Sequence, residues 1–280
     1  MQSDKFSAER GFMCNKRSES DSIGTLEIPA DAYYGVQTYR GYQNFHITGL
    51  PMNIGFVKNI VKIKKAAAIT NAKAGLIDDK TRDAIVTACD EALAGKLDAY
   101  FITDSIQGGA GTTANMNVNE VIANRATELL GGKKGEYICH PNDHVNRSQS
   151  TNDVIPTAGK LTVIDLYLEL KSATEDLIAA LDQKAVEFDN VIKMGRTQLE
   201  DAVPIRLGQE FAAYSSGIRR CLNLITRAVD EMYSVNLGGT AIGTAVNVNK
   251  TYLKKIVPTL CEITGYDLTQ AKNLIDSTQN

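Results

Sequence analysis

The sequence of 280 residues has little of what marks a membrane, secreted or nucleic-acid-binding protein. No apolar run is long enough to cross a bilayer, and the polar N-terminal stretch lacks the apolar core of a signal peptide. Thirty Lys and Arg residues against thirty-three Asp and Glu residues give a formal net charge of −3. This balance predicts no broad attraction to nucleic acid or to an anionic membrane. We therefore expect an ordinary soluble globular protein.

Cysteine is also scarce, and its placement excludes two kinds of site. The total is odd, no C-x-x-C spacing occurs, and the five positions are scattered: Cys14, Cys89, Cys139, Cys221 and Cys261. This pattern favours reduced thiols in a cytoplasmic protein over a disulfide scaffold or a zinc site. We interpret each cysteine as a packed small residue and predict no metal ligand among them.

Helical periodicity dominates from Asn53 onward. Apolar residues recur at three- or four-residue spacing in segments 53–75, 78–95 and 118–132, and in two much longer segments, 154–188 and 206–237. Residues 1–22 read as a flexible lead-in, and residues 23–52 as an irregular segment with one short strand or hairpin. The fold class is therefore predicted to be mainly α.

The turn-rich stretch before Val154 is the best domain boundary in the sequence. We predict a small irregular and helical N-terminal domain over 23–147 and a long-helix bundle domain over 148–280. Two long antiparallel helices and a short tail do not complete a bundle. The pattern therefore predicts either a fragment or helices supplied by another subunit.

The stretch "SQSTNDVIP", residues 148–156, precedes the longest helical pattern with more polar side chains than a helix cap needs. A helix N-terminus carries partial positive charge and free N–H groups, so it can hold a carboxylate without a dedicated arginine. Ser150, Thr151 and Asn152 are well placed to add donors to such an anion site. The simpler alternative is an ordinary cap.

A glycine-rich stretch, "GGAGTTANMN", also precedes a predicted helix. Its Gly109-x-Gly111-x-x-Ala114 spacing loosely matches a dinucleotide fingerprint, but no apolar strand follows the helix, so a nucleotide-dependent oxidoreductase is disfavoured. We favour a loop that brings backbone N–H groups and the hydroxyls of Thr112 and Thr113 to a small polar ligand. A tight turn with a threonine cap is the alternative.

Two further loops carry polar side chains. In "HPNDHVN", His140 and His144 have the spacing of a helical metal site, but Pro141 and Asn142 argue against a helix, so structural histidines in a turn are expected. In "KMGRTQLEDAVPIRLGQEF", a connection between the long helices, the candidate polar residues are Arg196, Thr197, Gln198, Glu200 and Asp201, with Pro204 opening the next helix.

This last loop lies at the far end of the long helix from residues 148–152. At about 1.5 Å of rise per residue the separation is on the order of 50 Å. The two loops cannot serve one site within one subunit, so if both are functional they meet across subunits. The alternative is a solvated connection.

Three blocks together resemble the fumarase/aspartase superfamily, and its aspartase branch most closely: "GGAGTTANMNVNEVIANRA", "HPNDHVNRSQSTND" and "GRTQLEDAVPIRLGQEF". The segments "IPADAYYGVQT" and "NLGGTAIGT" are similar to further blocks of the family. The resemblance covers residues 23–280. It implies a mainly helical subunit of three domains, a homotetramer built around the long helices, and active sites formed by three subunits.

The resemblance also assigns roles. Thr112, Ser150, Thr151 and Asn152 would bind substrate carboxylates, and Thr197 and Gln198 would reach the substrate from a neighbouring subunit. Fumarases of this type usually have histidine where this chain has Gln198, which favours an aspartase. The implied reaction removes ammonia from L-aspartate to give fumarate through a carbanion, needs no cofactor, and depends on preorganised donors.

One family signature is missing from these residues. The Gly-Ser-Ser-x-Met-Pro loop, which carries the serine base in the family, occurs nowhere in the 280 residues. We therefore expect no catalytic base in this chain and no lyase activity from it alone. Arg147, within "HVNRSQS", adds an unusual positive charge beside the anion loop. A class II fumarase and a non-catalytic binding protein on the same scaffold remain the alternatives.

Overall fold

The computed structural model describes residues 15–107 and 109–280, so Cys14 and the rest of the predicted lead-in up to residue 14 lie outside the described residues. Contacts divide the chain into two compact units. Unit 1 comprises the chain up to Ala158 together with Asn236–Asn280, and unit 2 comprises Gly159–Val235. The domain boundary predicted between residues 147 and 148 stays a prediction.

Unit 1 begins with a hairpin where the sequence predicts part of a flexible lead-in. Strand β1 (Lys16–Asp21) pairs antiparallel with β2 (Gly24–Pro29). The Arg17 guanidinium donates to the carbonyls of Pro29, Ala30 and Ala32 at 2.7 to 3.1 Å, so a polar side chain fastens the strand to the following segment. Because this anchor is a polar side chain, no apolar pattern in the sequence indicates the hairpin. Helix α1 (Val36–Asn44) follows the hairpin.

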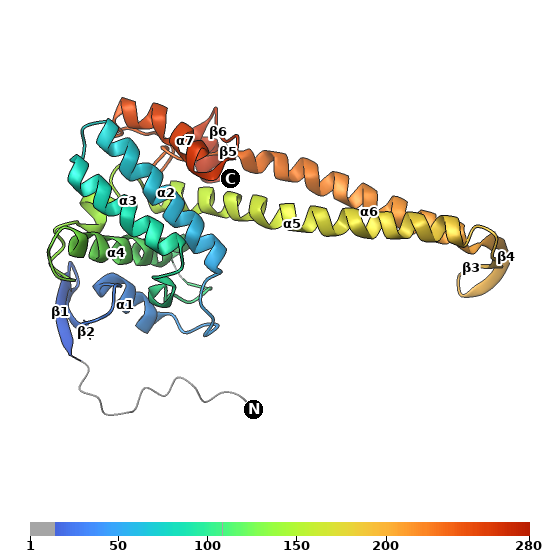
Figure 1. Cartoon of the computed structure of the whole chain (residues 1–280), viewed down its shortest axis with the longest axis horizontal. Coiled ribbons are helices and arrows are strands. Elements are labelled where there is room, and N and C mark those ends of the chain that lie inside the picture. The colour runs from blue at the N-terminus through green and yellow to red at the C-terminus, as the bar shows by residue number, and fades with distance from the viewer. Residues whose placement is uncertain (1–14, 108) are drawn as a thin grey trace. The chain divides into compact units, whose positions relative to one another are not determined.

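Four helices form the body of unit 1: α2 (Ile54–Lys73), α3 (Asp79–Leu93), α4 (Thr112–Leu129) and α7 (Lys250–Thr264) (Figure 1). Helix α2 packs against α3, α4 and α7, and α3 packs against α4. Asn53 and Asp78 cap α2 and α3 through their side chains, as polar residues before an apolar pattern should. The predicted helices 53–75 and 78–95 are therefore confirmed.

Shorter elements complete the described chain. They are the 3₁₀ turns η1 (Asp98–Tyr100), η2 (Gly109–Gly111) and η4 (Glu231–Tyr233), the π-helical turn η3 (Pro141–Val145), the two-residue strands β5 (Ser234–Val235) and β6 (Thr269–Gln270), and helix α8 (Leu274–Gln279). The turn η3 corrects the expectation that Pro141 and Asn142 exclude a helix. Proline is tolerated there because it occupies the first turn, where its missing N–H costs nothing.

Helix α4 buries amide and carboxylate side chains as well as apolar ones. The fully buried carboxylate of Glu120 accepts from the backbone N–H groups of Gly35, Gln37 and Thr38, at the N-terminus of α1. Asn124 donates to the carbonyl of Tyr33 at 2.8 Å. Much of the polar "NMNVNEVIANRA" run thus fastens the irregular N-terminal segment to the helical body, and burial raises the pKa of Glu120.

Unit 2 is a long helical hairpin. Helix α5 (Thr151–Glu187), of which the part from Gly159 belongs to this unit, lies beside α6 (Leu207–Asp230), as Figure 1 shows. The rings of Phe188 and Phe211 are 5.5 Å apart, and the hydroxyls of Tyr167 and Thr226 are 2.7 Å apart. The predicted long helices are confirmed, although α6 ends at Asp230 and the sequence pattern extends it to 237.

The connection between these helices is a β-hairpin and not an irregular loop. Strand β3 (Ile192–Thr197) pairs antiparallel with β4 (Glu200–Arg206). Pro204 lies inside β4, opposite Met194, so the expectation that it opens the next helix was wrong. The strand tolerates it because a two-stranded ribbon leaves N–H groups on its outer edge without ladder partners.

No helix among the described residues is long and apolar enough to cross a membrane.

Candidate functional site

The five polar residues 148–152 divide into structural anchors and groups that face outward. Ser148, in a left-handed conformation, donates to Asn71 Oδ1 at 2.8 Å. Gln149 Nε2 donates to the carbonyl of Val145 at 2.9 Å. Both side chains are therefore used to hold the loop against the rest of unit 1, which leaves residues 150–152 for a ligand.

Ser150 and Asp153 form a reciprocal cap on α5. The backbone N–H of Asn152 donates to Ser150 Oγ at 3.3 Å, and the backbone N–H of Ser150 donates to Asp153 Oδ1 at 2.9 Å. The buried Asp153 also accepts from the N–H groups of Gly238 and Thr240, each at 3.0 Å. Burial raises the pKa of this carboxyl, while its hydrogen bonds oppose the shift. Ser150 is thus both the cap and a hydroxyl donor at the helix N-terminus.

Asn152 is exposed, and its amide has a defined orientation. Its Nδ2 donates to the carbonyl of Ala241 at 2.7 Å, while Asn236 donates to the Asn152 carbonyl at 2.9 Å. Within residues 15–107 and 109–280, the Oδ1 of Asn152 has no hydrogen-bond partner. The side chain therefore offers an acceptor, which suits an N–H or O–H group of a ligand better than a carboxylate oxygen.

Thr112 begins α4 after a left-handed turn. Gly109, Ala110 and Gly111 all have positive φ, and Thr112 Oγ1 donates to the carbonyl of Gly109 at 2.7 Å. An added Cβ on Gly111 would lie 3.0 Å from Ile155 of α5, so the first turns of α4 and α5 are in contact. Unit 1 therefore brings Thr112 to the same region as Ser150, Thr151 and Asn152.

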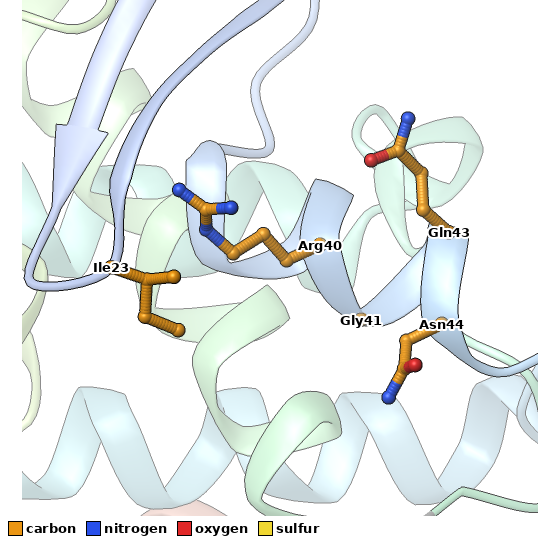
Figure 2. Close-up of a pocket in the computed structure, with 5 residues that line it drawn as sticks. All are labelled: Ile23, Arg40, Gly41, Gln43 and Asn44. Atoms are coloured by element: carbon orange, nitrogen blue, oxygen red, sulfur yellow. The ribbon is translucent and has the colours of Figure 1, made fainter.

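The surface beside Thr112 is hollowed. One pocket is lined by Gln37, Arg40, Thr112, Thr113 and Met116 among others, and a second continues it along α1 with Ile23, Gly41, Gln43 and Asn44. Figure 2 shows Arg40 reaching from α1 toward the turn that carries Ile23. Asp21 pairs with this guanidinium through two bonds of 2.8 and 3.0 Å, so its charge is already balanced.

A buried lysine lies beneath the anion loop. Lys64 of α2 is fully buried, and its ammonium donates to Asn115 Oδ1, Asn146 Oδ1 and Gln149 Oε1 at 2.7, 2.8 and 3.0 Å. Burial lowers the pKa of Lys64 to about 7, and the nearby Asp153 opposes the shift. Lys64 is not among the site residues predicted from the sequence.

Thr197 and Gln198 lie in unit 2, at the tip of the β3–β4 hairpin. Gln198 and Leu199 form its two-residue turn, both with positive φ, and Leu199 is 100% exposed. Two successive left-handed residues without glycine are strained, and such strain is typical of functional tips. The pair therefore belongs to unit 2, whereas Thr112, Ser150, Thr151 and Asn152 belong to unit 1.

The histidine pair serves the η3 turn. His140 Nδ1 accepts from the N–H groups of Asn142 and Asp143, each at 3.2 Å, and His144 Nδ1 accepts from the N–H of His140 at 2.8 Å. This is the structural role expected for the pair. Among the described residues, no cluster of three or more His, Cys, Asp or Glu side chains could hold a metal ion.

Comparison with known proteins identifies the family. The profile of a family described as lyases matches residues 24–280, which is most of the sequence. The chain belongs to the lyase family. The aspartate ammonia-lyase of Bacillus subtilis (strain 168) is 49% identical over 265 residues, covering 94% of this chain and 56% of the relative. The class II fumarate hydratase of Halobacterium salinarum is 46% identical over 258 residues, covering 92% and 55%.

Solved lyase structures show the same fold. The crystal structure of fumarate lyase:delta crystallin from Brucella melitensis matches with a TM-score of 0.91 at 45% identity, over 94% of this chain and 58% of that one. The class II fumarase from Schistosoma mansoni matches with a TM-score of 0.88 at 36% identity, over 94% and 59%. The predicted mainly-α, fumarase/aspartase-like fold is confirmed. The lyase chain spans between half and two thirds of the length of these relatives.

Proposed function

We propose that the lyase to which this chain belongs removes ammonia from L-aspartate and gives fumarate. Several relatives that are 46 to 49% identical over nearly all of the chain are aspartate ammonia-lyases. The observation that carries the proposal is the mixture of donors and acceptors around the α4 and α5 N-termini. Hydroxyls at Ser150 and Thr151 offer donors to a carboxylate, whereas Asn152 Oδ1 offers an acceptor to an amino group.

Thr112 adds a second hydrogen-bond acceptor to these groups. Because its hydroxyl hydrogen is used by the Gly109 carbonyl, the oxygen faces a ligand as an acceptor. An ammonium group can donate to Thr112 and Asn152 while a carboxylate accepts from Ser150 and Thr151. Removal of a proton from the β-carbon gives a carbanion whose charge spreads into the side-chain carboxylate, and preorganised donors at a helix N-terminus stabilise that charge before the C–N bond breaks and ammonia leaves. The elimination proposed here needs no cofactor.

A class II fumarase is the second candidate, because the Halobacterium and Schistosoma relatives carry that name. The two reactions share the dicarboxylate and differ in the leaving group, ammonia or water. Gln198 favours the ammonia-lyase, since fumarases of this type usually have histidine at that position of the motif. Assays of the full-length gene product with L-aspartate and with malate, following fumarate by absorbance, separate the two.

The site we propose is completed by other copies of the chain in a homotetramer. Thr197 and Gln198 lie on an exposed hairpin tip of unit 2, whereas the remaining site residues lie in unit 1. Exposed apolar side chains along α5 and α6 support association through this helical pair. We place the enzyme in the cytoplasm, and we propose neither nucleic acid nor a membrane as its partner.

The test of activity uses the 280-residue chain purified from a host that lacks its own aspartase. We expect the chain to bind fumarate but to release no ammonia from L-aspartate, because the serine-bearing loop of the family is not among its residues. Ammonia release at a rate proportional to the chain's concentration would show that a base lies within these residues. Failure to bind any dicarboxylate would instead favour the non-catalytic scaffold.

A further inference from the structure

We propose that Asn115, held by the buried Lys64, is a positioning residue that turns the Thr151 hydroxyl into a hydrogen-bond donor for the ligand. This inference rests on the proposed function, in which Thr151 binds substrate. It adds Lys64 of α2 and Asn115 of α4 to the site, and it requires the ligand atom beside Thr151 to be a hydrogen-bond acceptor.

The first step is the saturation of Lys64. A lysine ammonium has three N–H donors and no acceptor. Each of these donors bonds to the side-chain oxygen of an amide residue: Asn115 Oδ1 at 2.7 Å, Asn146 Oδ1 at 2.8 Å and Gln149 Oε1 at 3.0 Å. A carboxamide with its nitrogen turned toward this ammonium would place donor against donor. Lys64 therefore fixes the orientation of the three amides.

The second step follows from the Asn115 amide. Because its oxygen faces Lys64, its NH₂ group must face the opposite way. There it lies 3.3 Å from Asn146 Oδ1 and 3.3 Å from Thr151 Oγ1. Asn146 Oδ1 thus accepts from both Lys64 and Asn115, and Thr151 Oγ1 accepts from Asn115. The side chain of Asn115 is 1% exposed, so water does not offer it an alternative partner.

The third step concerns the Thr151 hydroxyl. Its oxygen receives the Asn115 N–H, so its own hydrogen cannot point back toward Asn115. Among the residues that the structure describes, no acceptor takes this hydrogen. Thr151 is the first residue of α5, half-buried beside the exposed Asn152, so the hydrogen is available to a ligand at the helix N-terminus. The ligand atom there must accept, as a carboxylate oxygen does and an ammonium does not.

The substitution that tests this chain of bonds is Asn115→Asp. A carboxylate keeps an oxygen for Lys64 but replaces the N–H donors with a second acceptor. Thr151 would then donate its hydrogen to the new carboxylate and lose it for the ligand. Binding of succinate, an unreactive dicarboxylate, is measured by titration calorimetry at about pH 6, where Lys64 is protonated, on the assembled 280-residue protein. We expect about tenfold weaker binding or more, the size expected for a hydrogen bond to a charged group.

Asn146→Asp is the matched control. It adds the same charge beside the same ammonium, and its retained oxygen still accepts from Lys64 and Asn115, whereas among the described residues Asn146 forms no hydrogen bond with Thr151. We expect it to weaken succinate binding by no more than about threefold, through charge alone. Thermal unfolding of each variant reports any loss of the fold. Should Asn115→Asp fail to fold, Asn115→Ala removes the same donor without adding a charge.

Asn115→Asp is also combined with each of two substitutions at Thr151. In Thr151→Ser, which keeps the hydroxyl, Asn115→Asp should cost as much affinity as in the unaltered chain. In Thr151→Val, which has no hydroxyl, it should cost no more than the Asn146→Asp control. Equal losses in the valine and serine backgrounds overturn the inference, while succinate binding by the unaltered chain upholds the site. No binding by the unaltered chain overturns the proposed function and the inference with it.

Discussion

At the scale of single residues, the buried Lys64 makes the stability of the fold depend on pH. Its pKa is lowered from an ordinary value of 10.5 to about 7 because the ammonium is buried. Below pH 7 both folded and unfolded chains hold the proton, so the full cost of the buried charge is present. Between pH 7 and 10.5 the unfolded chain holds more protons than the folded chain. The free energy of unfolding must therefore rise with pH across this window.

Lys64→Met should remove this rise. In the unaltered chain we expect the free energy of unfolding to increase by about 2 kcal/mol between pH 7 and pH 9, relative to the variant. Urea denaturation at the two pH values measures it. Lys73→Met, at an exposed position near the end of the same helix, is the control and should leave the increase intact. The same slope in Lys64→Met would mean that another group titrates.

The sequence contained one signal for Lys64 that was not used. The residue lies four positions after Ile60 and four before Ala68, on the buried face of α2. A lysine on an apolar face is normally read as exposed, because burying an unpaired charge is costly. The hydrogen-bond partners of Lys64 come from α4 and from the loop after η3, and no local sequence pattern indicates them. Thr112, Ser150, Thr151 and Asn152 could be named as candidates because each sits at a helix start, and their role as site residues stays a prediction.

At the scale of the elements, the contact between α5 and α6 depends on Gly208. A Cβ at this position would lie 2.3 Å from the carbonyl oxygen of Ala185 and 2.9 Å from the backbone of Asp189. These atoms belong to the backbone, which cannot move aside as the end of a flexible side chain can. The two helices therefore approach each other closely next to the β3–β4 hairpin, where only glycine fits without a shift of the backbone.

Gly208→Ala should lower the free energy of unfolding by about 1 to 3 kcal/mol, the usual cost of overpacking. Thermal unfolding followed by circular dichroism measures the loss. Ser216→Ala, at an exposed position of the same helix, is the control and should change stability by less than about 0.5 kcal/mol. An unchanged melting temperature for Gly208→Ala would mean that the helices can separate at this end without loss.

The long helices could be predicted from the sequence, whereas helix α7 and the β3–β4 hairpin could not. The repeated apolar spacing of α2, α3, α5 and α6 is a local property, so the sequence alone located them. Helix α7 was missed because Pro258 interrupts a pattern of ordinary length. The β3–β4 hairpin was missed because its turn is Gln-Leu, which lacks the Asn-Gly or Asp-Gly signal of a two-residue turn.

At the scale of the whole molecule, unit 2 exposes more apolar surface than a lone subunit should. Side chains left open along α5 and α6 include Leu166, Leu168, Leu170, Leu177, Tyr214 and Leu224. Leu177, Leu181, Ile218 and Leu224 line one continuous groove between the two helices. Isolated exposed leucines are ordinary, but a contiguous apolar groove indicates a contact surface. The groove is where we expect a second copy to pack.

We predict that light scattering will find the chain as a stable oligomer, and that Leu224→Asp will shift it toward the monomer. A charge placed in a desolvated contact typically costs several kcal/mol. Lys255→Glu, an exposed change of charge on α7 outside the groove, should leave the mass unchanged. A monomeric unaltered chain at micromolar concentration would contradict the prediction.

The burial of Lys64 bears on how the whole site responds to salt. Counterions screen a charge that faces solvent, such as a surface arginine, within about 10 Å at 0.1 M ionic strength, but they cannot enter a close-packed interior. While Lys64 is protonated, below about pH 7, a positive charge is held under the loop by amide oxygens, and the buried Asn115 amide links it to Thr151 as an oriented dipole. In the site that we propose, the part of the attraction for a dicarboxylate that comes from Lys64 should therefore weaken less with ionic strength than the pull of an exposed cation.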